Sequence, residues 1–395
     1  MKLLIYTHVW LPVMGGLQTV TTDLGNGFTE WGKAHPGEEV EVTIATETPA
    51  GEMRDDGLPF RVVRRPGLRA LMSLIRAADV VHIANPALKP LGLALLLGRP
   101  TVIEHDGNHA ACPNGMFLFQ PDRSVCPGHF QAGRYGKCVE CNTAEMGRRG
   151  SFMRVVWTFP RRWLAQRADV NIFPTAHIAR RVGLNGPRVI PHGVPKYSEL
   201  GAHSAGGNGA RPYFGYVGRL ANEKGVAVLL NACAKLAAEG QVFGVKIVGD
   251  GYERPLLEKL ARDLQIDSRI EFLGAFPVSD VQRSLGDPLA VIMPSICEDV
   301  APLAAYEQLM HGRLVIASDI GGLGEIVDGV SLKFPAGDAE ALAACMRRAL
   351  SEPALVSDLR DRAQRRALAA YTQQRMVSEH LDVYKALLGA ARGRN

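Results

Sequence analysis

The feature that most constrains the fold is a series of short apolar runs, each followed by a stretch with the period of an amphipathic helix. The runs are rich in Val, Ile and Leu along their length, as is typical of strands buried on both faces of a parallel sheet. Alternating strands and helices predict an α/β fold. The predicted strands are residues 2–6, 40–45, 61–64, 80–84, 101–104, 170–173 and 189–191, then 213–217, 245–248, 270–273, 289–293, 314–317 and 331–334.

The series occurs twice, with an aperiodic stretch rich in Gly, Ser and Ala between its halves. A chain of 395 residues also exceeds what one hydrophobic core usually covers. We therefore expect a Rossmann-like first domain over 1–195, a linker over 196–212 and a Rossmann-like second domain over 213–370. Ligands of open α/β sheets bind beyond the carboxyl ends of the strands, so functional residues are expected in the loops that follow strands.

Charge and hydropathy exclude several classes of protein. The 45 basic and 40 acidic side chains give a net charge of +5, too small an excess to indicate nucleic acid, and no nucleic-acid partner is expected. The excess suits anionic small molecules or an acidic membrane surface. The longest apolar run, 91–98, is too short to cross a bilayer, and the apolar stretch at the start is too short for a signal peptide. These features predict a cytoplasmic protein.

Two cations follow one predicted strand in "GYVGRLANEKGV". Arg219 and Lys224 flank the turn into the next helix, where backbone N–H groups without intrahelical partners point toward the same space. A turn of this kind can bind an anion. Two solvated surface charges are the alternative, because the segment is neither a P-loop nor a G-x-G-x-x-G motif.

Acidic residues stand on both sides of a predicted helix start in "PSICEDVAPLAAYEQL". Glu298 and Asp299 lie on the loop, and Glu307 lies more than one turn inside the helix. The N–H groups of Leu303 and Ala304 are free to bind a phosphate. A carboxylate at Glu307 can accept hydrogen bonds from a pair of ribose hydroxyls. The alternative is that the two loop acids only cap the helix.

Together these segments resemble the retaining glycosyltransferases of the GT-B fold, in the family 4 group. The resemblance is carried by "GRLANEKG", "VGDGYE", "IEFLGAF", "PSICEDVAPLAAYEQL" and "SDIGGLGEIV" within 218–327, and by "MGGLQTV" near the start. It implies two Rossmann-like domains facing a cleft, with the acceptor on the first and the sugar nucleotide on the second. It also implies that residues 371–395 pack back on the first domain.

The same resemblance implies an activity. A hexosyl or hexosaminyl group would pass from a UDP-, GDP- or ADP-sugar to a saccharide or lipid-linked acceptor, in bacterial polysaccharide or glycoconjugate synthesis. Retention by double displacement would need a carboxylate nucleophile beside the anomeric carbon, and no residue stands out as one. The resemblance implies instead that departing phosphate oxygens help to deprotonate the acceptor on the same face, with no cofactor required for catalysis.

Residue by residue, the resemblance assigns the diphosphate to Arg219 and Lys224, and the ribose to Glu307. The family's E-x7-E pattern places Asp299 in the first acidic slot, with Glu298 one residue earlier, and the identity of this first acid stays open. The implied catalytic residues are His105, Arg219, Lys224, Glu298 and Asp299. The implied donor-binding residues are Gly15, Gly16, Asp250, Gly251, Phe272, Leu273, Leu303, Ala304 and Glu307.

Three of these residues lie in the first domain. Gly15 and Gly16 follow the first strand and open a helix, where glycine allows close backbone approach to a ligand; a plain tight turn is the alternative. His105 follows the strand 101–104, and the resemblance puts a histidine there near the transferred sugar. The alternative is a structural histidine, and His109 is a second candidate.

Four cysteines lie in an insertion of the first domain, at about 106–145. Cys112, Cys126, Cys138 and Cys141 stand among Gly and Pro residues and end in C-x-x-C, a spacing that suits tetrahedral thiolate binding. We expect a structural zinc that ties down a loop with little core of its own. Free thiols, a redox pair or an iron–sulfur cluster are the alternatives.

The stretch 148–167 mixes six arginines with Trp157, Phe159 and Trp163. Such a stretch can lie on an acidic membrane surface or meet a lipid-phosphate acceptor, which would make the protein peripheral at the inner face of the membrane. The alternative is a helix that packs its aromatic face on the domain.

Two other functions remain open on the same architecture. One is a sugar-nucleotide epimerase or a phosphorylase. The other is a non-catalytic subunit that binds a nucleotide. This alternative is suggested by the cysteine insertion and by the departure of Glu298 and Asp299 from the family's E-x7-E pattern.

Overall fold

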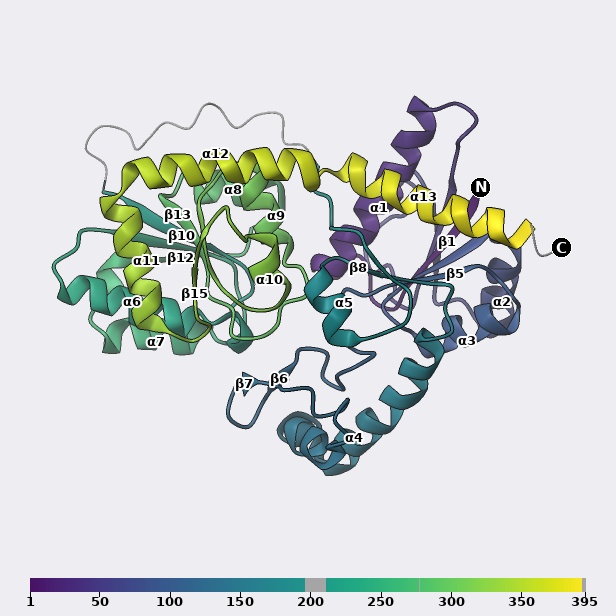
Figure 1. The fold of residues 1–395 in the computed structure, drawn as a ribbon, viewed down its shortest axis with the longest axis horizontal. Helices are drawn as coiled ribbons and strands as arrows, with labels where there is room; N and C mark the ends of the chain where they lie inside the picture. Colours follow the sequence, from purple (N-terminus) through teal and green to yellow (C-terminus); the bar gives the residue numbers. More distant parts are fainter. Residues whose placement is uncertain (196–210, 277, 393–395) are drawn as a thin grey trace. The chain divides into compact units, whose positions relative to one another are not determined.

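The computed structural model describes residues 1–195, 211–276 and 278–392, which divide into two compact units (Figure 1). Unit 1 comprises Met1–Asp122, Cys126–Pro195 and the segment from Tyr371 onward, and unit 2 comprises Arg123–Val125 and the chain from Lys196 to Ala370. The predicted linker, 196–212, lies almost wholly outside the described residues. Each unit is built around one parallel sheet, as the alternating pattern predicts.

The sheet of unit 1 has the strand order β3-β2-β1-β4-β5-β8-β9. Each of its neighbouring pairs is parallel. The strands are β1 (Lys2–Thr7), β2 (Glu41–Thr46), β3 (Arg61–Arg64), β4 (Val80–Ala84), β5 (Thr101–Glu104), β8 (Val170–Phe173) and β9 (Pro187–Val189). The short β6 (Leu118–Phe119) lies in the insertion, and β7 (Ser124–Val125) groups with unit 2.

The helices of unit 1 include one from the end of the chain. They are α1 (Gly16–Ala34), α2 (Leu68–Ala77), α3 (Leu88–Leu96), α4 (Tyr135–Ala165), α5 (Ala176–Val182) and α13 (Gln373–Arg392). α13 packs against α1 (Figure 1, yellow and purple), and a Cβ at Gly27 of α1 would lie 2.4 Å from a methyl carbon of Val377. The segment from 371 onward therefore belongs to unit 1.

The sheet of unit 2 has the order β12-β11-β10-β13-β14-β15, again with parallel neighbours. Its strands are β10 (Tyr213–Val217), β11 (Gly244–Val248), β12 (Ile270–Gly274), β13 (Ala290–Met293), β14 (Val315–Ser318) and β15 (Leu332–Phe334). Its helical segments are η1 (Asn222–Lys224), α6 (Val226–Ala238), α7 (Arg254–Asp263), η2 (Asp267–Arg269), α8 (Val278–Leu285), α9 (Leu303–Met310), α10 (Gly321–Ile326), α11 (Ala339–Ser351) and α12 (Pro353–Ala370).

The core of unit 2 follows from the apolar pattern of its strands and helices. Phe214 and Phe243 are fully buried with the apolar face of α6, which includes Leu229, Leu230 and Leu236. Burying one such side chain contributes about 1.5–3 kcal/mol before the entropy of ordering is subtracted. The α/β prediction and the parallel sheets are confirmed.

The predicted strand at 189–191 is misplaced. The structure has β9 at Pro187–Val189, and all three of its residues are exposed. The strand lies at the edge of the sheet, where burial does not require an apolar run. The prediction followed the apolar residues at 189–191, which overlap only the end of the strand.

Among the described residues, no helix combines the length and the hydropathy that crossing a membrane requires.

Candidate functional site

The strand order of unit 2 reverses between β10 and β13. Phe214 of β10 pairs with Ala290 of β13, while the other side of β10 pairs with β11. At such a reversal the loops beyond the carboxyl ends of the two strands form a ligand crevice. These loops are 218–225 and 294–302, and they hold Arg219, Lys224, Glu298 and Asp299.

Glycine brings these two loops into backbone contact. Gly225 has φ 67°, and a Cβ at this position would lie 1.9 Å from the carbonyl oxygen of Pro294. Next to this contact, the N–H of Ile296 donates to the carbonyl of Glu223 at 3.0 Å. Any side chain at 225 would force the loops apart, so this glycine sets their spacing.

Lys224 is held by Asp299 across the two loops. The Nζ of Lys224 lies 2.6 Å from Oδ1 of Asp299, and the hydroxyl of Ser295 donates to Oδ2 at 2.6 Å. Burial lowers the pKa of Lys224, but the charge of Asp299 more than offsets it, and the pKa lies above its ordinary value. The ammonium is therefore a fixed cation. Ser295 was not predicted, since a serine four residues before an acid carries no distinctive signal.

Arg219 belongs to the same group of charges but is far more exposed. Its side chain is 70% exposed and lies 3.0 Å from Glu223. An exposed pair of this kind contributes at most about 1 kcal/mol, so a bound anion can redirect the guanidinium. The charge of Arg219 lowers the pKa of Lys224, which places the two cations within electrostatic reach of each other.

Helix α9 starts four residues after Asp299, the acid that holds Lys224. Pro302 occupies the cap position with no side-chain cap hydrogen bond, so the helix begins at Leu303. The amides of Leu303 and Ala304 are thus at a helix terminus without a side-chain cap. Glu307 lies in the second turn, and burial raises the pKa of its carboxyl group.

Glu298 is buried, with 8% of its surface exposed. Its backbone is packed by the first residue of α10, because a Cβ at Gly321 would lie 2.7 Å from Cα of Glu298. The N–H of Gly322 donates to the carbonyl of Asp299 at 2.8 Å. These glycines lie in the segment "SDIGGLGEIV", but the sequence did not show what their backbones would touch.

The predicted donor-binding residues Asp250 and Gly251 also lie close to the loop 218–225. The N–H of Leu220 donates to the carbonyl of Asp250 at 2.9 Å, and a Cβ at Gly251 would lie 2.3 Å from the carbonyl oxygen of Leu220. Phe272 and Leu273 lie on the edge strand β12, half-buried against core residues. The structure therefore brings Asp250 and Gly251 to the loop of Arg219, while Phe272 and Leu273 lie two strands away from β10.

In unit 1, a pocket of about 460 Å³ lies beyond the carboxyl ends of β1 and β4, where that sheet also reverses. Its polar lining comprises Tyr6, His8, Glu47, Asn85, Lys89, His109 and Arg161. Asn85 has φ 65°, a conformation often found in functional loops. Burial, then Arg161 and Arg154, lower the pKa of His109 to about 4, so the imidazole is neutral.

His105 is at the end of β5, as expected, but it is fully buried and is not part of the pocket lining. Its ring stacks on Phe173 with centroids 4.4 Å apart, and Nε2 lies 2.8 Å from Oδ1 of Asn171. Burial lowers its pKa to about 4. Gly15 and Gly16 open α1 as predicted, with Gly15 in the cap position. A catalytic role for His105 stays a prediction.

The four cysteines of the insertion are buried as free thiols. The sulfur of Cys141 accepts hydrogen bonds from the Asn114 side-chain amide at 3.3 Å and from the Gln120 N–H at 3.4 Å. Burial raises the pKa of Cys112 to about 11 and that of Cys138 to about 12. Within the described part of the chain, no three sulfurs form a group with all atoms within 4.8 Å of one another.

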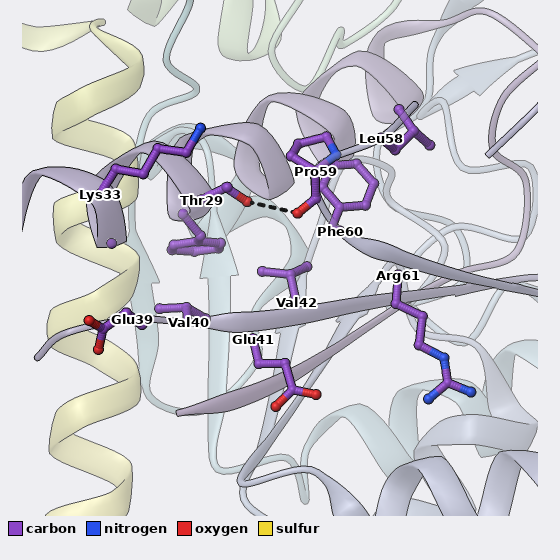
Figure 2. A pocket seen from close by; sticks show the side chains of 12 residues that line it. Thr29, Lys33, Glu39, Val40, Glu41, Val42, Leu58, Pro59, Phe60 and Arg61 are labelled. Carbon is purple, nitrogen blue, oxygen red and sulfur yellow. Dashed lines mark hydrogen bonds between the residues drawn. The ribbon is translucent and has the colours of Figure 1, made fainter. Parts of the chain in front are cut away.

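A further pocket of unit 1 lies between α1 and the start of β2 (Figure 2). Lys33, Glu39 and Arg61 are among its lining residues, and the hydroxyl of Thr29 donates to the carbonyl of Pro59 at 3.5 Å. Because it adjoins the amino end of β2 rather than its carboxyl end, it holds none of the predicted site residues.

Comparison with known structures defines the class of fold. The chain superposes on sucrose-phosphate synthase from Thermosynechococcus elongatus with a TM-score of 0.71 and 19% identity, covering 98% of this chain and 99% of that one. It superposes on Anabaena Alr3699/HepE, solved with UDP and glucose, with a TM-score of 0.69 and 15% identity, covering 98% and 100%. The fold is therefore the two-domain α/β fold of GT-B glycosyltransferases.

Sequence comparison finds a family of glycosyltransferases that resembles unit 2. Residues 211–352 match the family described as "Glycosyl transferases group 1". The 2-deoxystreptamine glucosyltransferase of Streptomyces kanamyceticus is 33% identical over 147 residues, 37% of this chain and 38% of that protein. The putative colanic acid biosynthesis glycosyltransferase WcaL of Salmonella typhimurium is 32% identical over 135 residues, 32% and 33% of the two chains. The chain thus spans well under half the length of these relatives.

Proposed function

We propose that this protein is a retaining glycosyltransferase that moves a hexosyl or hexosaminyl group from a nucleoside-diphosphate sugar to a saccharide or lipid-linked acceptor. The observation that carries the proposal is the fixed ammonium of Lys224, 2.6 Å from Asp299, in the loop crevice that also holds Arg219. The group 1 match over 211–352 supports it, as do the relatives' names and the UDP and UDP-glucose complexes of the Anabaena neighbour.

In this proposal the cations receive the leaving group. When the sugar–phosphate bond breaks, negative charge grows on the diphosphate. Lys224, Arg219 and the amides of Leu303 and Ala304 would stabilise that charge. These donors would already be in position before the bond breaks. A hydrogen bond to a charged group contributes about 1.5–3 kcal/mol, which is roughly one to two decades of rate if it forms only in the transition state.

We assign the two loop acids different roles. Both oxygens of Asp299 are engaged, one by Lys224 and the other by Ser295, so Asp299 positions the lysine. Glu298 is then the acid assigned to the transferred sugar. Glu307 would accept hydrogen bonds from the ribose hydroxyls. Burial raises the pKa of its carboxyl group, and perturbed pKa values of this kind are typical of residues that bind a ligand.

In this proposal, unit 1 binds the acceptor. Its pocket of about 460 Å³ has the volume of a small-ligand site and is lined by Asn85, Lys89, His109 and Arg161. A neutral His109 can hydrogen-bond an acceptor hydroxyl and help to position it. Same-face attack, with the departing phosphate oxygens accepting the proton, would retain the anomeric configuration.

A lipid-linked acceptor is favoured by the surface of α4. Gly147 has φ 68° and ψ 167° and breaks α4, so residues 148–165 form a separate helical segment. That segment exposes Phe152, Met153, Trp157 and Trp163 by 45–58% each, next to arginines. The pattern is that of a helix lying at an acidic membrane surface, and we propose peripheral membrane contact there.

We also propose a structural zinc on Cys112, Cys126, Cys138 and Cys141. The N–H donors around Cys141 suit a thiolate better than a thiol. Bound metal would draw the four sulfurs together and replace the buried thiols by paired thiolates. It would hold the insertion and take no part in transfer.

Product analysis tests the proposal. The full chain is incubated with UDP-, GDP- and ADP-sugars and candidate acceptors, and nucleoside-diphosphate release and product anomers are followed by NMR. Acceptor-dependent release with retained configuration is expected, slowed by roughly one to two decades in Lys224→Ala and unchanged in Lys235→Ala, an exposed lysine of α6. Release without acceptor, or conversion of the donor to its epimer, would overturn it.

A further inference from the structure

A separate cluster of buried titratable side chains lies inside unit 1, where three distant parts of the chain meet. His82 is in the middle of β4, Glu104 ends β5 and His380 comes from α13. β4 and β5 are neighbours in register, with Ala84 opposite Glu104, so His82 and Glu104 project from the same face of the sheet. Their exposed fractions are 0%, 2% and 0% for His82, Glu104 and His380.

The ligand-type atoms of these residues converge. His82 Nε2 lies 3.1 Å from Glu104 Oε2, and His380 Nε2 lies 3.7 Å from Glu104 Oε1. One ligand atom from each of the three residues lies within 4.8 Å of the other two. Ligand atoms around a tetrahedral ion are separated by roughly 3.3 Å, given metal–nitrogen and metal–oxygen distances of about 2.0–2.1 Å.

The outer nitrogens of both imidazoles are already engaged. His380 Nδ1 lies 2.8 Å from the carbonyl oxygen of Met376, and because a carbonyl only accepts, Nδ1 carries the hydrogen. His82 Nδ1 lies 2.7 Å from the hydroxyl oxygen of Tyr384. Fixing the outer nitrogen of a histidine in this way is how proteins orient metal-binding imidazoles.

The inner atoms do not satisfy one another. Within the described residues, His82 Nε2, His380 Nε2 and Glu104 Oε1 have no hydrogen-bond partner, and the 3.1 Å approach of His82 to Glu104 lacks the direction of a hydrogen bond. Buried polar atoms are rarely left in this state. One proton could serve only one nitrogen–oxygen contact, whereas one cation between the three side chains would serve all of them.

We propose that His82, Glu104 and His380 bind a divalent metal ion of the zinc type, at a structural site separate from the cysteine insertion. Two imidazoles and a carboxylate are a donor set that zinc accepts, and both oxygens of Glu104 face imidazoles, so bidentate binding supplies a fourth ligand atom. His192 and Asp106, 3.0 Å apart, form a neighbouring pair, and Nδ1 of His192 lies 3.8 Å from Oε1 of Glu104.

The site would join the end of the chain to the sheet. His380 is 276 positions beyond Glu104, and α13 reaches unit 1 only after the whole of unit 2 has been made. A metal between them would anchor α13 on β4 and β5, and it would stabilise the folded state because an unfolded chain has no such site. The metal site would form whether or not the protein transfers a sugar.

Metal analysis tests the site. The full chain, purified without a metal-affinity tag or chelator, is analysed by plasma mass spectrometry as wild type, Glu104→Gln, His380→Gln and Cys141→Ser. Glu104→Gln and His380→Gln are each expected to lose one metal equivalent per chain that Cys141→Ser keeps. Equal metal content in wild type and Glu104→Gln would overturn the proposal.

Cobalt provides a measurement that does not rely on the folding of those variants. Wild-type and Cys141→Ser proteins are stripped with a chelator and titrated with Co²⁺ alone. A visible cobalt spectrum without sulfur-to-metal charge transfer, retained in Cys141→Ser, is expected from a nitrogen–oxygen site, and Zn²⁺ should displace it and raise the Tm. If every bound cobalt ion shows thiolate charge transfer, or the Tm does not respond to Zn²⁺, the site does not exist.

Discussion

Lys224 and Asp299 are 75 positions apart in the chain, and their charged groups lie 2.6 Å apart where the loops after β10 and β13 meet. The same contact explains why Lys224 stays charged although it is largely buried, since Asp299 raises the pKa that burial alone would lower. Under the proposed function, this pair holds a cation ready for the diphosphate.

Asp299→Asn is expected to slow turnover by roughly tenfold or more, because the amide no longer holds the ammonium in place. Without the carboxylate, burial and the charge of Arg219 lower the pKa of Lys224. The activity of the variant should therefore decline at a lower alkaline pH than that of wild type. Rates of nucleoside-diphosphate release across pH 7–10 measure this. Glu340→Gln, which breaks an exposed pair with Lys235 at 2.9 Å, is the matched control. Identical pH profiles would show that Asp299 does not act through the lysine.

Glu307→Gln should stabilise the ligand-free protein while weakening nucleotide binding. Burial raises the pKa of Glu307, so the folded state holds its proton more tightly than the unfolded state. The stability contributed by the protonated form is present at low pH and is lost as pH rises from about 4.5 through the raised pKa. The Tm of the variant relative to wild type should thus increase over that window and then level off. Calorimetry at several pH values checks the trend, and a constant difference would contradict it.

Gly225→Ala and Gly240→Ala separate backbone strain from loop contact. Both glycines have positive φ, 67° and 76°, but only at Gly225 would a Cβ strike another atom, the Pro294 oxygen at 1.9 Å. Gly240→Ala should cost about 1–2 kcal/mol of stability and keep activity. Gly225→Ala should cost more and abolish donor binding, because the two loops must separate. Denaturant unfolding and nucleotide titration provide the comparison, which fails if the two variants behave alike.

Vesicle binding tests the surface of α4. The double variant Phe152→Ser/Trp157→Ser should lose most of its cosedimentation with phosphatidylglycerol vesicles, whereas Leu256→Ser, at an equally exposed apolar position of unit 2, should not. Added salt should weaken wild-type binding because arginines contribute to it. Binding that is absent in wild type, or unaffected by the double variant, would rule out this surface as the membrane contact.

If the cysteine insertion binds zinc, Cys141→Ser should lose one zinc per chain and have a lower Tm, while Cys345→Ser, a thiol of α11 in unit 2, should change neither. Stripping wild type with a chelator should reproduce the loss of stability. Protein that carries no thiolate-bound metal before stripping would leave these residues as plain buried thiols.

The sequence predicted most strands within one residue, because parallel strands buried on both faces leave continuous apolar runs, as in β4 and β5. It failed at β9, which is exposed, and at the two-residue β6 and β7, which are too short to leave a pattern. Local spacing therefore located elements whose burial is complete and missed those whose pairing is marginal.

The candidate site was predictable where function requires charged residues next to strands, as for Lys224 and Asp299. What sequence could not supply were contacts between distant backbones and side chains. The approach of Gly321 to Glu298, the Ser295 hydrogen bond and the meeting of His82 with His380 depend on tertiary structure. His105 illustrates the same limit, since a strand-end position did not reveal that its ring is buried against Phe173.

The most direct test of diphosphate binding by Lys224 is calorimetric titration of wild-type and Lys224→Ala protein with UDP, GDP and ADP and with the corresponding nucleosides. We expect wild type to bind one diphosphate far more tightly than its nucleoside, and Lys224→Ala to lose roughly one to two decades of affinity for that diphosphate while its affinity for the nucleoside is unchanged. Equal affinity of wild type for diphosphate and nucleoside, or an unaltered diphosphate affinity in the variant, would contradict the proposed role of the lysine.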